Sequence, residues 1–146
     1  MTPMSPRERF LTAVKHGTPD RVPACPCLSN MVPARRTGKP FWEVYLHKNP
    51  PLWRAYLEAA RYYGIDGRMI YGGLGFESSQ NPVSRETTVL EQDESRIRTR
   101  TVLHTPAGDL YSETLYTADN PPSTSVKLIK NIETDFPKLR HLYPEV

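Results

Sequence analysis

A stripe of apolar residues at helical spacing opens the chain and predicts a helix over Pro6–Lys15. The stripe consists of Phe10, Leu11 and Val14, and the positions expected to stay solvated are Arg7, Arg9 and Lys15. Ser5 and Glu8 have the spacing of a capping box, in which the two side chains bind free amide groups at a helix start. Gly17 is suited to the left-handed conformation that ends a helix, and Pro19 prevents continuation.

Two more helices are predicted before residue 65. The first is short and covers Phe41–His47, and the second covers Pro50–Tyr63, with Asn49 as its cap and Gly64 as its end. The apolar face of the second helix consists of Leu52, Trp53, Tyr56, Leu57, Ala60 and Tyr63. A short apolar run bounded by glycines then favours a buried strand over Arg68–Tyr71. A helix, a tight turn and a buried strand in this order are typical of an α/β protein.

The spacing changes to a period of two from Ser84 onward, which predicts an antiparallel meander. Its strands are expected at Thr87–Glu91, Arg96–His104 and Asp109–Thr117, with a turn at Thr105–Gly108 between the last two. The end of the chain predicts an extended entry and a short helix around residues 134–142, because Pro137 is tolerated only near a helix start.

The arginines of this meander form a stripe on one face, namely Arg96, Arg98 and Arg100. Such a stripe can bind phosphates or an acidic partner, but Glu91, Glu94 and Glu113 lie close enough in the sequence to neutralise it. A solvated, internally neutralised sheet face is the favoured interpretation.

The two cysteines lie in an extended segment, Val22–Leu28, which Pro23 and Pro26 confine to a sheet edge or an irregular path. Cys25 and Cys27 are poorly placed to bridge each other, and we interpret them as buried thiols. The four histidines are scattered without the spacing of metal ligands, at positions His16, His47, His104 and His141. No metal site and no catalytic residue is predicted in this chain.

Composition limits the classes of function. A net charge of +3 over 146 residues is too small to argue for nucleic-acid binding. No apolar run reaches the roughly 18 residues of a membrane span, and the start lacks the apolar core of a secretory signal, so the expected location is the cytoplasm. With 15 prolines and 38% hydrophobic residues the core is modest, and exposed apolar surface is expected to promote oligomerisation.

Four segments, taken in order, resemble the N-terminal part of the uroporphyrinogen decarboxylase superfamily. They read RERFLTAVKHGTPDRVP, FWEVYLHKNPPLWRAYLEAARYYGIDG, LHTPAGDLYSETLY and KLIKNIETDFPKLRHL. That superfamily includes tetrapyrrole decarboxylases and corrinoid-linked methyltransferases. The first segment is the most specific, and the others are similar mainly in their order.

The resemblance implies an α/β fold in which this chain is the N-terminal portion of a (β/α)8 TIM barrel with an antiparallel β-meander insertion. Residues 1–146 would form a single, partial domain. Its parts would be helices and the first barrel strand in 1–83, the meander in 84–120, and an extended segment with a short helix in 121–146. The parent enzyme would decarboxylate a tetrapyrrole or transfer a methyl group, and this fragment alone would be inactive.

The implied ligand site centres on Arg35 and Arg36 in the segment NMVPARRTGKPFWE. Decarboxylases of the family carry an arginine-rich segment there that holds substrate carboxylates, although its motif is not reproduced here. The family's aspartate after the next strand is also absent, because Asp66 precedes that strand. No cofactor is expected in this chain, but a methyltransferase parent would use zinc and a corrinoid. The alternative function is a self-contained α+β binding module that presents the arginine stripe to an acidic partner.

Overall fold

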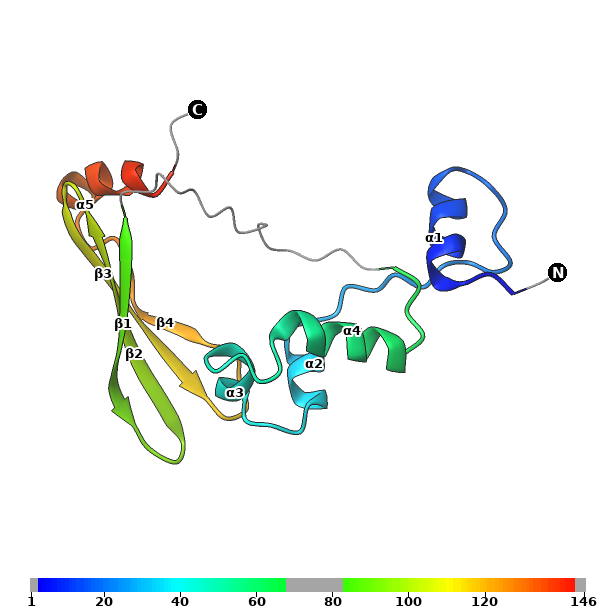
Figure 1. Cartoon of the computed structure of the whole chain (residues 1–146), viewed down its shortest axis with the longest axis horizontal. Helices are drawn as coiled ribbons and strands as arrows, with labels where there is room; N and C mark the ends of the chain where they lie inside the picture. The colour runs from blue at the N-terminus through cyan, green and yellow to red at the C-terminus, as the bar shows by residue number, and fades with distance from the viewer. Residues whose placement is uncertain (1–2, 68–82, 144–146) are drawn as a thin grey trace. The chain divides into compact units, whose positions relative to one another are not determined.

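The computed structural model describes residues 3–67 and 83–143, which belong to two compact units, Met1–Gly73 and Leu74–Val146 (Figure 1). We refer to them as the helical unit and the sheet unit. The helical unit contains α1 (Pro6–Val14), α2 (Met31–Arg36), α3 (Phe41–Tyr45) and α4 (Leu52–Tyr62). The sheet unit contains β1 (Ser84–Gln92), β2 (Arg96–Thr105), β3 (Gly108–Thr117), β4 (Ser123–Val126), α5 (Ile132–Leu139) and a 3-10 turn, η1 (Arg140–Leu142).

Helix α1 is bounded by local hydrogen bonds, and its predicted start is confirmed. The Ser5 hydroxyl accepts the Glu8 amide at 3.3 Å, and the Glu8 carboxylate accepts the Ser5 amide at 2.9 Å. At the other end the left-handed residue is His16, with φ 59°, so the expectation for Gly17 is wrong. A Cβ at position 17 would lie 2.9 Å from Cγ2 of Thr12, so a larger residue there would require Thr12 to shift. The Gly17 amide donates to the Thr12 carbonyl at 2.8 Å and closes the helix.

The core of the helical unit forms where α2 and α3 pack together and α2 packs on α4. Its buried residues are Pro33, Ala34, Phe41, Val44, Ala55, Tyr56 and Ala59. The predicted apolar face of α4 is only partly correct, because Trp53 is 58% exposed and the small residues Ala55 and Ala59 are buried instead. Alanines let α2 approach closely, which larger side chains at these positions would prevent. Gly64 ends α4 with φ 64°, as predicted, but Asn49 does not cap it.

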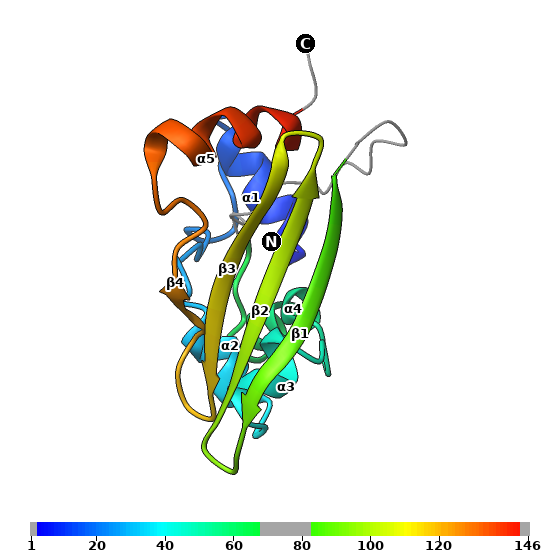
Figure 2. The same ribbon diagram turned by 90° about the vertical axis from the view of Figure 1, so that its left-hand side faces the viewer.

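The sheet unit is a four-stranded antiparallel meander with strand order β1-β2-β3-β4 (Figure 2). The predicted hairpin is confirmed: Thr105 pairs with Gly108, and Leu103 pairs with Leu110. Alternate positions are buried, as the period of two predicts, and they include Ile97, Thr99, Leu103 and Leu110. Helix α5 begins at Ile132, where the Asn131 side chain accepts the Glu133 amide at 2.8 Å.

The predicted fold class is wrong. The described residues form a small α+β structure in which helices precede an antiparallel sheet, rather than the N-terminal portion of a (β/α)8 barrel. A barrel requires parallel strands joined by helices, and every strand pair described here is antiparallel. The expected strand Arg68–Tyr71 lies outside the described residues.

Two smaller expectations concern the segment before α2. Val22–Leu28 follows an irregular path without strand pairing, which is one of the two outcomes that its prolines predict. Cys25 and Cys27 are free and exposed, so the interpretation as buried thiols is wrong. In residues 3–67 and 83–143, no helix combines the length and the apolar character needed to cross a membrane.

Candidate functional site

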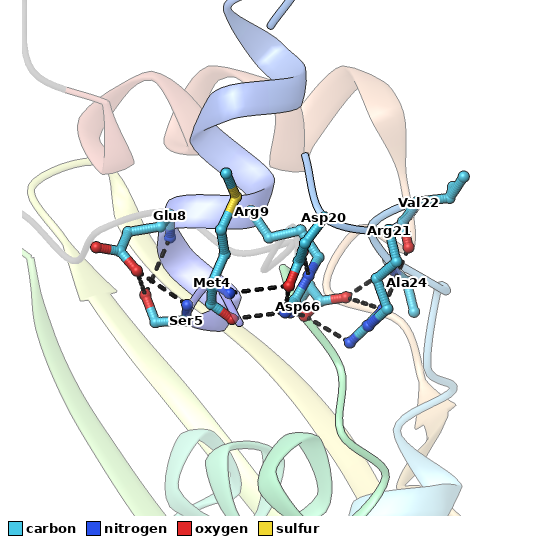
Figure 3. Close-up of polar contacts among 9 residues, drawn as sticks. All are labelled: Met4, Ser5, Glu8, Arg9, Asp20, Arg21, Val22, Ala24 and Asp66. Atoms are coloured by element: carbon cyan, nitrogen blue, oxygen red, sulfur yellow. Dashed lines mark hydrogen bonds and ion pairs between the residues drawn. The ribbon is translucent and has the colours of Figure 1, made fainter. Parts of the chain in front are cut away.

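Arg9 of α1 is buried, with 6% of its surface exposed, although the sequence pattern predicts a solvated position. Its Nε lies 2.5 Å from Oδ1 of Asp20, and its Nη2 donates to Oδ2 of the same residue at 2.9 Å. Its Nη1 donates to Oδ1 of Asp66 at 2.5 Å (Figure 3). The guanidinium therefore joins α1 to the segment after it and to the residues that follow α4.

Asp66 is the second centre of this network, and its side chain is fully buried. Nη1 of Arg21 lies 2.7 Å from Oδ2 of Asp66, and Nη2 of Arg21 donates to Oδ1 of Asp66 at 3.0 Å. The Ala24 amide donates to Oδ2 at 2.9 Å, and the Asp66 amide donates back to the Ala24 carbonyl at 2.9 Å. We call Arg9, Asp20, Arg21 and Asp66 the ion-pair network (Figure 3).

Contacts within the network favour the charged forms of Arg9, Asp20 and Asp66. Hydrogen bonds from Arg9, followed by one from the Met4 amide, keep the pKa of Asp20 well below its usual range. The Ala24 amide, followed by the arginines, lowers the pKa of Asp66, while Asp20 raises that of Arg9. Each carboxylate is thus occupied by partners from its own chain. The network is suited to joining segments of the chain.

Arg35 and Arg36 lie in the last turn of α2, a helix that the sequence analysis does not predict. Both are exposed, and neither side chain forms a hydrogen bond or ion pair with the described residues. The Arg36 guanidinium carbon lies 3.5 Å from the centre of the Tyr62 ring. The Thr37 hydroxyl donates to the Ala34 carbonyl at 2.7 Å, so this carbonyl at the C-terminal end of α2 has a hydrogen-bond donor. We call Arg35 and Arg36 the α2 arginine pair.

The arginine stripe of β2 is neutralised within the chain, as the favoured interpretation predicts. Arg96 and Arg98 lie 2.6 and 3.0 Å from the Glu91 carboxylate. Arg100 lies 2.6 Å from the carboxylate of Glu113, a residue that is only 6% exposed. Glu94 forms no ion pair with these arginines among the described residues. Instead, Oδ2 of Asp93 lies 3.4 Å from Nε of Arg96.

A histidine that the sequence reasoning left unassigned lies between two acids on the same sheet face. Nδ1 of His104 lies 2.9 Å from Asp109, and its Nε2 lies 3.7 Å from Glu86. The pairing registers place these residues on neighbouring strands β3, β2 and β1. In the described parts of the chain, no group of three histidine, cysteine, aspartate or glutamate residues is arranged to hold a metal ion.

The ion-pair network is the feature that sequence reasoning missed. Arg9 and Asp66 are 57 positions apart, so no local periodicity relates them. A signal was nevertheless present, because Arg9, Asp20 and Arg21 belong to the most specific segment of the resemblance and Asp66 belongs to the second. Comparisons of the chain with protein-family models, curated proteins and solved structures find no match in any of the three.

Proposed function

We propose that this chain is the amino-terminal region of an enzyme of the uroporphyrinogen decarboxylase superfamily, acting on a tetrapyrrole, a corrinoid or a methyl donor. Within that enzyme the chain contributes ligand binding, and the α2 arginine pair contacts acidic groups of the ligand. The catalytic groups for decarboxylation or methyl transfer come from other parts of the enzyme. The chain alone is therefore expected to catalyse neither reaction.

The observation that carries the proposal is the contrast in how arginines are paired. Five arginines of the network and the stripe have acidic partners within the chain: Arg9, Arg21, Arg96, Arg98 and Arg100. Arg35 and Arg36 are exposed and have no such partner among the described residues, as is also true of Arg7, Arg61, Arg85 and Arg140. The α2 arginine pair is distinguished from these by its place in the resemblance and by the contact of Arg36 with Tyr62. A guanidinium group has a planar fork of donors that matches a carboxylate, and tetrapyrrole substrates carry carboxylates at their rim.

The ion-pair network adds support from the segments of the resemblance. Residues of the first and second segments, Arg9 and Asp66, contact each other directly at 2.5 Å. The two segments are therefore joined in the folded chain.

The chemistry of the described residues does not fit the zinc site of a methyltransferase parent. Such a site needs several histidine or cysteine ligands around one ion, and the described residues contain no suitable group. Zinc binding and thiol activation are therefore not assigned to this chain.

The alternative function, an acidic partner bound by the β2 stripe, is not favoured. An incoming acid would have to displace Glu91 or Glu113 from arginines that they already neutralise. The exchange replaces one charge-assisted contact by another and gains little free energy.

The proposal is tested by titrating uroporphyrin, a stable carboxylated tetrapyrrole, into the chain and into the R35A/R36A variant. Each lost charge-assisted contact is expected to cost about 1.5–3 kcal/mol, which is roughly 10- to 150-fold in affinity. The control is Arg54→Ala, since Arg54 is an exposed arginine paired with Glu58 at 3.5 Å. It should bind as the unchanged chain does. Equal affinity of the double variant, or no binding by the unchanged chain, would show the proposal to be wrong.

A further inference from the structure

We infer that Tyr62 is a positioning residue for Arg36, and that together they form a preorganised docking point for an oxyanion of a small polyanionic ligand. This inference deepens the proposed function and rests on it for the identity of the ligand. It adds a residue of α4 to a site that the sequence places on α2 alone.

The geometry of the Arg36 contact orients the guanidinium group and leaves its N–H donors available to a ligand. The guanidinium carbon lies 3.5 Å from the Tyr62 ring centre, which is within cation–π distance. The N–H donors of a guanidinium lie in its own plane, so contact through its face leaves them free to bind an anion. Among the described residues, no acceptor takes them up. Stacking also restricts the side chain, and less conformational entropy is lost when a ligand binds.

The sheet unit contains a related cluster, in which Nζ of Lys130 lies 3.4 Å from the centre of the Tyr111 ring. Arg100 lies 4.9 Å from the centre of the Tyr111 ring, and its Nε and Nη2 donate to Oε1 of Glu113 at 3.1 and 2.6 Å. There the chain supplies both the aromatic ring and the carboxylate. At Arg36 the ring is present and no carboxylate of the described residues contacts the guanidinium, so its donors are open to an acid of a ligand.

The position of Arg35 indicates how many acidic groups the ligand carries. Successive residues of a helix project about 100° apart, so Arg35 and Arg36 are not placed to share one carboxylate. Two separate acidic groups on one molecule can engage both arginines. A small molecule with two or more oxyanions therefore fits the pair, and carboxylates and phosphates are two sources of this chemistry.

The experiment uses two probes, mellitate for carboxylates and tripolyphosphate for phosphates, titrated calorimetrically into the full chain. Tyr62→Leu is expected to weaken mellitate binding roughly three- to tenfold, because a cation–π contact of this kind is lost. Tyr62→Phe keeps the ring and should bind within about twofold of the unchanged chain. The matched control is Trp53→Leu, which removes an exposed aromatic side chain of the same helix and should have no effect.

A double-mutant cycle separates positioning from a merely structural role. If Tyr62 acts through Arg36, Tyr62→Leu should have no further effect in a chain that already carries Arg36→Ala. Additive losses, an equal loss in Tyr62→Phe, or no mellitate binding by the unchanged chain would overturn the inference. Circular dichroism of each variant confirms that the comparison is between folded proteins.

Failure of this inference is distinguishable from failure of the proposed function. Uroporphyrin binding that depends on Arg35 and Arg36 but not on Tyr62 would contradict only the role of Tyr62. Mellitate binding that depends on Tyr62, without any binding of uroporphyrin, would contradict only the proposed function. Tighter binding of tripolyphosphate with the same dependence on Tyr62 would support the docking point and identify phosphate as its ligand.

Discussion

Arg9 and Arg36 both lie on short helices of the helical unit, yet their surroundings are opposite. Arg9 is buried and contacts two aspartates, whereas Arg36 is exposed and contacts a tyrosine ring. A buried guanidinium requires acidic partners from its own chain, because an unpaired charge is costly away from water. An exposed guanidinium has no such requirement and stays available to a ligand. The two arginines therefore differ in what the fold requires of them: Arg9 needs its aspartates, and Arg36 needs no acid of its own chain.

The largest expected effect comes from breaking the ion-pair network at its buried end. Asp66→Ala leaves Arg9 buried with one of its two acids removed, and it also removes the acceptor of the Ala24 amide. The melting temperature of the helical unit is expected to fall by roughly 10 °C or more. Tryptophan fluorescence measures this unit selectively, since both tryptophans, Trp42 and Trp53, lie in it.

Arg21→Ala is the matched control for this prediction. The Arg21 side chain is 50% exposed, and Asp66 keeps its contacts with Arg9 and Ala24 when it is removed. A shift of only a few degrees is expected. If Arg21→Ala and Asp66→Ala shift the melting temperature equally, burial is not what distinguishes the members of the network.

A pH titration sharpens the comparison with a smaller effect. The pKa values of Asp20 and Asp66 are lowered in the folded chain, so the unfolded chain binds more protons as the pH falls. Their stabilising contribution is complete above the unfolded value of about 4 and is lost as the pH falls from there toward the folded values. The urea midpoint of the unchanged chain should therefore decrease between pH 5 and pH 3.

The same titration of Asp66→Ala provides the comparison, because other acids also titrate in this range. The variant should show a weaker dependence of its urea midpoint on pH than the unchanged chain does. Parallel curves for the two proteins would mean that Asp66 does not contribute to acid unfolding.

Local signals in the sequence predicted much of the secondary structure. The capping residues of α1, the helical spacing of α4 and the period of two in β2 and β3 each act over a few residues, and all four elements are present. Helix α2 was missed because it has only six residues and contains Pro33. The prediction of a barrel was wrong because it came from the resemblance and not from any pattern in the residues.

The candidate site was predicted in part. The α2 arginine pair was chosen from its place in the resemblance, and its role in binding stays a prediction. Tyr62 was not chosen, since its contact with Arg36 joins residues 26 positions apart on different helices. The ion-pair network escaped notice for the same physical reason: tertiary contacts between distant segments leave no periodic trace in the sequence.

The most direct test of the account is urea unfolding of the R35A/R36A variant, followed by tryptophan fluorescence. The central claim is that these arginines serve binding and not folding. The free energy of unfolding should change by no more than about 1 kcal/mol, the size of an exposed cation–π contact together with a surface substitution. Asp66→Ala should be strongly destabilised in the same assay. A loss of stability in R35A/R36A as large as that in Asp66→Ala would contradict the claim.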